Sequence, residues 1–294
     1  MTNVIFRRKG LGKSTCEGIK VFMKNPVDIV VNGRDRVKQG TRNLIRWGCT
    51  AGYPGLLLSG QVINTAVDIS KVSNKGYFRN VLNTHGVCPP THINPSIFNP
   101  ERYSQGVVVR PNRHAQGKEI HLCYSEDEIV HTMSKYRFDA YWSQYIPKVK
   151  EYRVFLANRG VLCVIEKIPE DPTQLAWNHA QGSEIPNIRW SNWPIGAVKV
   201  AERACRLASL DFCAADVIEG EDGQFYVLEL NSAPTLSPYR QEKFAKVFDY
   251  MLDNPNNYPE RFPVDSSLES WEQCIHPAVM KKPETIPNRG YVLS

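Results

Sequence analysis

One segment in the last third of the chain predicts a β-hairpin that carries acids on one face. Asp222–Gly223 lies between two apolar runs, and Asp-Gly in that setting is a strong signal for a two-residue turn. With these two residues as the loop, Glu221 faces Gln224. Counting back in step along both strands, Asp216 faces Glu229, so the sequence predicts two carboxylates side by side on neighbouring strands.

Two facing carboxylates need something of opposite charge between them. Directly paired residues on antiparallel strands have Cβ atoms ~4.5–5.5 Å apart, and like charges at that distance destabilise a sheet. Asn231 points to the same face as Glu229. The alternating residues are apolar and are expected to face the core: Val217, Leu228 and Leu230. Carboxylate and amide oxygens suit Mg²⁺, so we predict a metal site; the alternative is a solvated polar face with a loosely paired acid couple.

Length and composition place the chain among globular proteins of about two domains. It has 294 residues, of which 42% are hydrophobic, and domains of ~100–200 residues are typical. No apolar run approaches the ~18 residues that span a bilayer, and the charged N-terminus lacks the apolar core of a signal peptide. These features predict a cytoplasmic protein with no membrane partner.

The eight cysteines form no C-x-x-C pair, which favours reduced, buried thiols over zinc or disulfides.

The charge balance is mildly basic. The net charge is +6 and the isoelectric point is about 8.8, which favours either simple solubility or an anionic partner such as a nucleotide, an acidic peptide or nucleic acid. Because no Lys/Arg run is longer than Arg7–Lys9, nucleic acid is the less favoured partner.

The order of predicted elements divides the chain into three parts. Strands and helices alternate in the first third, expected over 4–6, 14–24, 28–31 and 68–84, which is typical of a small α/β unit with parallel strands. The prolines of Cys88–Thr91 cannot sit in a helix or a central strand, so we place a boundary there. The predicted parts are an α/β domain over 1–87, a strand-rich domain over 88–255 and a Pro-rich extended tail over 256–294.

A second hairpin is predicted over residues 151–167. Asn158–Gly160 reads as a three-residue loop with glycine last, and this loop puts Glu151 opposite Lys167. A cross-strand ion pair of this kind contributes little stability at a surface.

Gly10–Thr15 is similar to a phosphate-binding P-loop. That pattern needs a glycine five residues before Gly12, so that backbone N–H groups can wrap around phosphate, and this chain has Arg7 there. The favoured interpretation is a strand-to-helix turn with Ser14 as the helix N-cap. A P-loop nucleotide-binding protein that uses Gly12, Lys13 and Ser14 is the alternative.

The first hairpin resembles the signature of the ATP-grasp enzymes. The matching residues are Asp216-Val-Ile on one strand and Val-Leu-Glu229-Leu-Asn231-Ser-Ala-Pro234 on the other. They look closest to the branch of the ribosomal-protein glutamate ligases and glutathione synthetases, and the resemblance extends over about residues 60–255. It implies an α/β (α+β) ATP-grasp fold behind a small N-terminal pre-ATP-grasp domain. In that family the two acids and the asparagine hold one or two Mg²⁺ ions against ATP.

The same resemblance implies further site residues around the nucleotide, the reacting phosphate and the acceptor. Arg110 and Arg153 are the expected catalytic cations, and Arg110 stands where the family usually has lysine. The expected nucleotide-binding residues are Lys75, Arg110, His114, Gln116, Gly117, Gln144, Tyr145, Ile146, Glu151, Lys167 and Asn178. Of these, His114–Gly117 is similar to the family's glycine-rich loop over the phosphates, and Asn178 belongs to a loop that is similar to the one at the acceptor site.

The activity implied by the resemblance is ATP-dependent ligation of a carboxylate to an amine or a thiol. ATP would phosphorylate the carboxylate, and the amine would displace phosphate from the acylphosphate. The residues do not identify the general base, the carboxylate donor or the amine acceptor; an amino acid joined to a peptide, to a small metabolite or to a modified base all fit. A P-loop NTPase and a non-catalytic ATP-grasp binding module are the alternatives.

Overall fold

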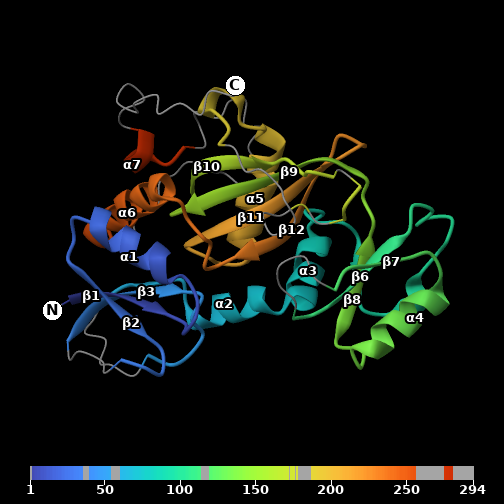
Figure 1. Ribbon diagram of the computed structural model, residues 1–294, viewed down its shortest axis with the longest axis horizontal. Coiled ribbons are helices and arrows are strands. Elements are labelled where there is room, and N and C mark those ends of the chain that lie inside the picture. The colour runs from blue at the N-terminus through green and yellow to red at the C-terminus, as the bar shows by residue number, and fades with distance from the viewer. Residues whose placement is uncertain are drawn as a thin grey trace.

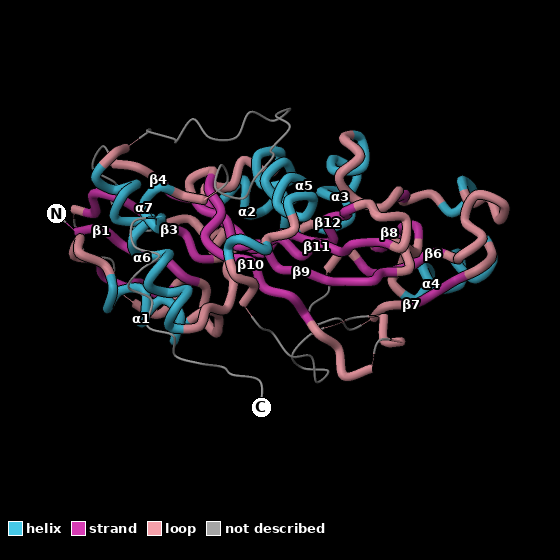
Figure 2. The backbone as a smooth tube through the Cα atoms, turned by 90° about the horizontal axis from the view of Figure 1, so that it is seen from above, coloured by secondary structure: helices cyan, strands magenta, loops and turns pink. Residues whose placement is uncertain are grey.

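In the part of the chain that the structure describes, three four-stranded sheets form the framework of the protein. The structure is a computed structural model (Figure 1), and it describes residues 2–35, 40–53, 60–113, 119–171, 173–175, 177, 187–255 and 275–280. The sheets follow one another along the longest axis, with β1–β4 at one end, β9–β12 in the middle and β5–β8 at the other end (Figures 1 and 2). This mixed architecture confirms the predicted fold class.

The N-terminal sheet is parallel, as the alternation of strands and helices predicted. Its order is β2-β1-β3-β4, and its strands are β1 (Thr2–Arg7), β2 (Val27–Val31), β3 (Thr41–Trp47) and β4 (Val62–Ile63). Helix α1 (Lys13–Phe22) begins with Gly12 as its N-cap, at φ +65°, and no side chain caps it. The predicted cap Ser14 is therefore wrong: glycine adopts the left-handed conformation without strain and ends the turn two residues earlier.

The helix predicted over 68–84 is in fact two helices. They are α2 (Ala66–Ser73) and α3 (Lys75–Thr84), separated by Asn74. The Asn74 side-chain oxygen accepts a hydrogen bond from the Tyr77 N–H at 3.2 Å, which caps the second helix in the manner that asparagine favours. The break therefore places Lys75 at the first residue of α3.

The sheet at the far end is antiparallel with order β5-β8-β6-β7. Its strands are β5 (Thr91–His92), β6 (Val107–Pro111), β7 (His121–Cys123) and β8 (Ala140–Gln144), and the short helix η1 (Pro95–Ile97) follows β5. Helix α4 (Glu126–Lys135) begins after Ser125, whose hydroxyl oxygen accepts from the Glu128 N–H at 3.2 Å. Ile129 and Met133 of this helix pack with Trp142 in the core of this end.

The middle sheet contains both predicted hairpins and has the antiparallel order β10-β9-β11-β12. Its strands are β9 (Lys148–Ala157), β10 (Gly160–Lys167), β11 (Phe212–Gly220) and β12 (Phe225–Asn231), and its helices are η3 (Trp190–Asn192), α5 (Ile195–Leu207) and α6 (Pro238–Asp253). Phe244 and Phe248 of α6 pack on Phe212, with ring centroids 6.0 and 5.1 Å apart. Phe212 points to the same face of β11 as Asp216, four residues on. Aromatic side chains of α6 thus pack against one end of the sheet face that carries the acids.

The β11–β12 hairpin does not have the predicted turn. Its loop holds three residues, Glu221–Gly223, and the Gly223 N–H donates to the Gly220 carbonyl at 2.9 Å. Gly223 has a left-handed conformation, with φ +73°. A three-residue loop that ends in a left-handed residue is common in hairpins. Gly220, and not Glu221, therefore bonds to Gln224 across the turn.

A β-bulge restores the predicted pairing of the acids. Leu228 is an extra residue on β12, so Asp216 pairs with Glu229 while Val217 pairs with Val227. The prediction that Leu228 faces the core is wrong for the same reason, because the bulge turns its side chain toward two cavities and Val227 is buried in its place.

The β9–β10 hairpin shows the opposite combination. Its loop is Asn158–Arg159, with φ of +48° and +61°, as in a type I′ turn, and not the predicted three residues ending in Gly160. An extra residue at Leu162 on β10 then brings Glu151 opposite Lys167, as predicted.

The remaining features of the fold concern the cysteines and the C-terminal tail. The cysteines within the described ranges are buried free thiols, as expected. None of the helices that the structure describes is long and apolar enough to cross a bilayer. Of the tail, the structure describes residues 275–280: Ile275 bridges Val161 on β10, His276 is buried, and α7 (Pro277–Met280) follows.

Candidate functional site

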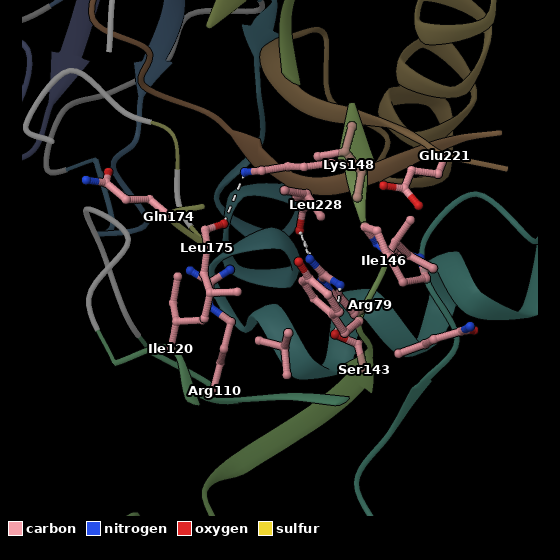
Figure 3. A pocket seen from close by; sticks show the side chains of 16 residues that line it. Arg79, Arg110, Ile120, Ser143, Ile146, Lys148, Gln174, Leu175, Glu221 and Leu228 are labelled. Carbon is pink, nitrogen blue, oxygen red and sulfur yellow. Dashed lines mark hydrogen bonds between the residues drawn. The ribbon is translucent and has the colours of Figure 1, made fainter. Parts of the chain in front are cut away.

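Two adjoining cavities lie on the acid-bearing side of the middle sheet. The larger has a volume of about 580 Å³ and is lined from all three sheets or the loops next to them. The smaller, of about 240 Å³, is lined mainly by β6, the end of β8 and the start of β9 (Figure 3). Four residues line both cavities: Arg110, Ile120, Leu175 and Leu228. A single ligand could therefore extend through both.

The larger cavity contains a cluster of alternating charges, which we call the charge cluster. Its members are Lys75, Glu151, Arg153, Lys167, Asp216 and Glu229. Asp216 has its place in the middle of the sheet, since it pairs with Arg153 of β9 on one side and with Glu229 of β12 on the other. The strand order thus places a cation on one side of the Asp216 carboxylate and a second acid on the other side.

Two cations hold Asp216. Arg153 donates from Nε to Asp216 Oδ1 at 2.6 Å and from Nη2 to Oδ2 at 2.8 Å. This is the bidentate geometry that guanidinium groups favour with carboxylates. Lys167 Nζ lies 3.3 Å from Asp216 Oδ2. Burial alone would raise the pKa of Asp216, but the two cations outweigh it and hold that pKa well below its usual range. Asp216 is therefore a carboxylate at any physiological pH.

Glu229 has a cation of its own. Lys75 Nζ donates to Glu229 Oε2, which the helix break at Asn74 makes possible. Burial raises the pKa of Glu229, and the positive charge of Lys75 more than reverses this, so the pKa is lowered. Asn231 Nδ2 donates to Glu229 Oε1 at 3.1 Å, so the three predicted metal ligands lie next to one another.

Glu151 links the charge cluster to the smaller cavity. Lys167 Nζ donates to Glu151 Oε1 at 2.5 Å, and Lys148 Nζ donates to Oε2 at 2.6 Å. Residues three apart on a regular strand point to opposite faces, but a bulge at Val149 puts Lys148 and Glu151 on the same side. Burial lowers the pKa of Lys148 despite the nearby carboxylate. Lys148 also donates to the Leu175 carbonyl at 3.1 Å (Figure 3).

The arrangement modifies the sequence argument for a metal. Three side-chain cations already offset the facing acids, so the pairing of Asp216 with Glu229 does not by itself require an ion. The donor set still fits Mg²⁺, because this ion takes one or two carboxylates and completes its shell with water and substrate phosphates. The described residues contain no cluster of three or more His, Cys, Asp or Glu that could hold a metal alone. Asp216, Glu229 and Asn231 would therefore share the ion with a bound ligand.

Arg110 connects the two cavities. It lies on β6 and lines both of them, and its Nε is buried without a hydrogen-bond partner within the described residues. Burial lowers the pKa of its guanidinium. A buried cation with an unused donor is costly unless a ligand supplies the acceptor, so Arg110 is suited to an anionic ligand that spans both cavities.

The smaller cavity contains the predicted Gln144, Tyr145 and Ile146, at and just beyond the end of β8. It also contains two cations that were not predicted, Arg79 and Lys148. Arg79 follows Lys75 by four residues on α3, and residues so spaced share a helix face; that spacing was the available signal. No comparable sequence signal identifies Lys148, because its position depends on the bulge at Val149.

Arg79 supports the bulge that aligns the acids. Its Nε and Nη2 donate to the Leu228 carbonyl at 3.0 and 2.7 Å, as Figure 3 shows. The other bulge has a similar support, since Lys243 Nζ donates to the Leu162 carbonyl at 2.9 Å. In both hairpins, a buried cation thus satisfies the carbonyl of the extra residue.

Replacing Arg79 by methionine should lower the free energy of unfolding by about 1–3 kcal/mol, because it leaves the buried Leu228 carbonyl without its donor. Urea denaturation measures this loss. Arg102→Met is a matched control, because Arg102 is exposed and only rests 5.4 Å from the Tyr103 ring centroid. Equal losses in the two variants would contradict a supporting role for Arg79.

Several predicted residues lie outside the described part of the chain or away from the cavities. His114, Gln116, Gly117 and Asn178 are outside the described residues. In the P-loop alternative the key residue is Lys13, which is exposed and is not among the residues that line either cavity. The remaining predicted residues, from Lys75 to Asn231, all line one cavity or both.

Comparisons with known proteins agree with this geometry. The RimK-like ATP-grasp domain matches residues 95–248, and no curated protein matches the chain by sequence. The ATP-grasp ligase PsnB, complexed with minimal precursor, Mg and ADP, is 13% identical with a TM-score of 0.60 over 86% of this chain and 99% of that chain. The macrocyclase MdnC bound with precursor peptide MdnA, from Microcystis aeruginosa MRC, is 15% identical with a TM-score of 0.56 over 84% and 99%. D-alanine–D-alanine ligase from Bacillus anthracis is 13% identical with a TM-score of 0.56 over 86% and 95%.

Structural likeness at such low identity establishes a common fold and nothing more. The family match is stronger, because it spans just over half of the chain and includes Arg110, both hairpins of the middle sheet and the facing acids. The chain therefore belongs to the RimK-like ATP-grasp family.

Proposed function

We propose that the protein is an ATP-dependent ligase that joins a carboxylate to an amine through an acylphosphate, with release of ADP and phosphate. The observation that carries this proposal is the continuity of the two cavities at Arg110 and Leu228. A nucleotide has a flat base and a strongly anionic tail. The smaller cavity has apolar walls beside backbone groups, and the larger one contains the charge cluster.

The base would occupy the smaller cavity. Val108, Ile146 and Leu228 provide apolar walls there, and Gln144–Pro147 provides backbone groups at the end of β8. The phosphates would extend past Arg110 into the larger cavity, where five cationic side chains face three acidic ones. That excess of positive charge suits a triphosphate next to a carboxylate, because the two repel each other in its absence.

The chemistry needs charge compensation more than it needs a protein nucleophile. A carboxylate oxygen of the substrate attacks the γ-phosphorus, the bond to the β-phosphate oxygen breaks and ADP leaves. The amine nitrogen then attacks the acyl carbon, phosphate departs and the nitrogen loses a proton. Arg110, Arg153 and Lys167 would offset the negative charge of both steps. Mg²⁺ on Asp216, Glu229 and Asn231 would neutralise part of the phosphate charge when it is bound.

The carboxylate and amine are proposals by class only. The PsnB structure contains its minimal precursor and the MdnC structure contains its precursor peptide, and D-alanine–D-alanine ligase is named for a small amino acid. A peptide and a free amino acid are therefore the first candidates to supply as substrates.

A screen for ADP release tests the proposal. Amino acids, short peptides and carboxylic acids are supplied with ATP and Mg²⁺, and the mass of each product is measured. Turnover should give a product lighter by one water than the sum of its substrates. Release of AMP, or of ADP without a condensed product, would contradict a ligase of this class.

Glu229→Gln separates this function from the P-loop alternative. We expect it to lower ADP release by at least ~100-fold, the upper end of the loss when a supporting metal-site residue is removed. Lys13→Ala should leave the rate unchanged, since Lys13 is exposed outside both cavities. Loss of activity in the lysine variant alone would reverse the assignment.

A further inference from the structure

The N-terminal sheet has a topological switch point beside the larger cavity. From β1 the chain crosses through α1 to β2 on one side, while β3 and β4 lie on the other side, in the order β2-β1-β3-β4. In open parallel sheets, ligands bind outside the carboxyl ends of the strands at the point where the strand order reverses. Here that point lies between Arg7, which ends β1, and Trp47, which ends β3.

The loops after these two strands line the larger cavity. Arg8 and Leu11 follow β1, and Gly48 follows β3. Gly48 has φ +60°, and a Cβ built on it would come 2.7 Å from the Ala233 Cβ and 2.9 Å from the Leu11 Cδ2. Only glycine fits there, so this end of the cavity is a closely packed junction between the N-terminal sheet and the segment after β12.

Among the residues that the structure describes, Arg8 is the one charged residue that the N-terminal sheet and its loops contribute to the cavity lining. Its side chain is exposed and has no hydrogen bond or ion pair with any other residue that the structure describes. The loop behind it is held in place, since buried Arg7 donates from Nη1 to the Leu11 carbonyl at 3.1 Å and the Leu11 N–H donates to the Arg8 carbonyl at 3.2 Å. A free guanidinium thus stands on a supported loop.

The surroundings of Arg8 leave its charge unbalanced. Within the described part of the lining, the acids all belong to the charge cluster and already have cations of their own. The lining residues at the other end are neutral and mostly small: Leu11, Gly48, Ser232, Ala233 and Thr235. A guanidinium in such a setting binds a carboxylate through two parallel hydrogen bonds.

We propose that Arg8 binds a carboxylate of the substrate that takes no part in the reaction. This inference rests on the proposed ligase function and names its substrate class. The charge cluster receives the reacting group, and Arg8 holds a second, unreactive carboxylate on a short, weakly polar stem. The substrate is therefore either an amine acceptor with a free carboxylate, such as an α-amino acid, or a dicarboxylic acid donor.

Matched pairs of acids and amides test this subsite. Each proteinogenic amino acid is compared with its C-terminal amide, and succinate and glutarate with their monoamides, by the melting-temperature shift of the full chain in ADP and Mg²⁺. At least one acid should stabilise the protein more than its amide, and the arm in which this occurs identifies acceptor or donor. Where that acid also turns over, Arg8→Gln should raise its KM by about 10- to 100-fold, the loss of one charge-assisted pair, with KM for ATP unchanged.

Two further variants make the test specific. Arg8→Lys should recover part of the preference for acids, because it retains the charge but not the planar fork. Lys9→Gln removes an exposed neighbouring charge that does not line the cavity, and it should retain the full preference. The proposal is overturned if no acid is preferred to its amide, or if Arg8→Gln keeps the preference.

The outcomes separate this subsite from the ligase itself. ADP release that is equal for acids and amides and is unaffected by Arg8→Gln would remove the subsite and leave the ligase. A preference for acids that depends on Arg8, with no condensed product from any pair, would leave the subsite and remove the ligase.

Discussion

Asp216→Asn should lower the free energy of unfolding by about 3–5 kcal/mol and abolish ADP release, because removing one partner of a buried ion pair leaves charges uncompensated. Arg153 and Lys167 both approach this carboxylate, within 2.8 and 3.3 Å, and an amide cannot balance either of them. Urea denaturation and the ADP-release assay measure the two effects. Both are expected to be large, since Asp216 is buried at the centre of the charge cluster.

Glu219→Gln is the matched control for this variant. Glu219 lies on the same strand and accepts a hydrogen bond from the Tyr152 hydroxyl at 2.8 Å, which an amide oxygen can also accept. It does not line either cavity. The same carboxyl-to-amide change at Glu219 should lower the free energy of unfolding much less than the change at Asp216. Comparable losses at the two positions would mean that the ion pairs of Asp216 do not contribute specifically to stability.

The pH dependence of stability follows from the same ion pairs. The pKa values of Asp216 and Glu229 are lowered in the folded state, so their contribution is present above the unfolded values of ~4 and is lost as the pH falls through the folded ones. The wild type should therefore lose stability steadily below about pH 4, and Asp216→Asn should lose less over the same range. If the free energy of unfolding of Asp216→Asn falls with pH as steeply as that of the wild type, Asp216 is not held as a carboxylate by its cations.

The facing acids could be predicted from the sequence, although neither turn was predicted correctly. In one hairpin the loop is a residue longer than expected, in the other it is a residue shorter, and in each a bulge at Leu228 or Leu162 adds the residue that restores the register. Strand alternation constrains where polar side chains must point, whereas a bulge leaves no simple pattern in the sequence. The pairings predicted by counting from the turns are therefore right because, in each hairpin, the bulge cancels the error in the loop length.

Other parts of the site depend on contacts that a single hairpin cannot reveal. Arg153 meets Asp216 because β9 and β11 are neighbours in the middle sheet, and nothing in either hairpin specifies that order. Lys148 reaches Glu151 only through a bulge, and Lys75 reaches Glu229 only because Asn74 interrupts the predicted helix. The types of residue in the site could be predicted, and the way in which they neutralise one another could not.

Lys167→Met should lower the free energy of unfolding by about 3–5 kcal/mol, because it leaves two buried carboxylates with one cation fewer. Lys167 Nζ lies 2.5 Å from Glu151 and 3.3 Å from Asp216, and it is buried. Its pKa is raised: burial lowers it, and the two carboxylates more than compensate. The deficit relative to wild type should shrink as the pH falls below about 4, since Lys167 helps to lower the pKa of Asp216 and protonation of Asp216 removes a charge that Lys167 offsets.

Lys150→Met provides the control on the same hairpin. Lys150 lies 3.9 Å from Glu166 in an exposed pair, and pairs of that kind contribute about 0–1 kcal/mol. The double variant Asp216→Asn, Lys167→Met completes a thermodynamic cycle. Because each single change removes the partner of the other, the double variant should lose less than the sum of the two, by about 0.5–3 kcal/mol. Additive losses would mean that Lys167 acts on Glu151 alone, and the charge cluster would then be two separate ion pairs instead of one connected unit.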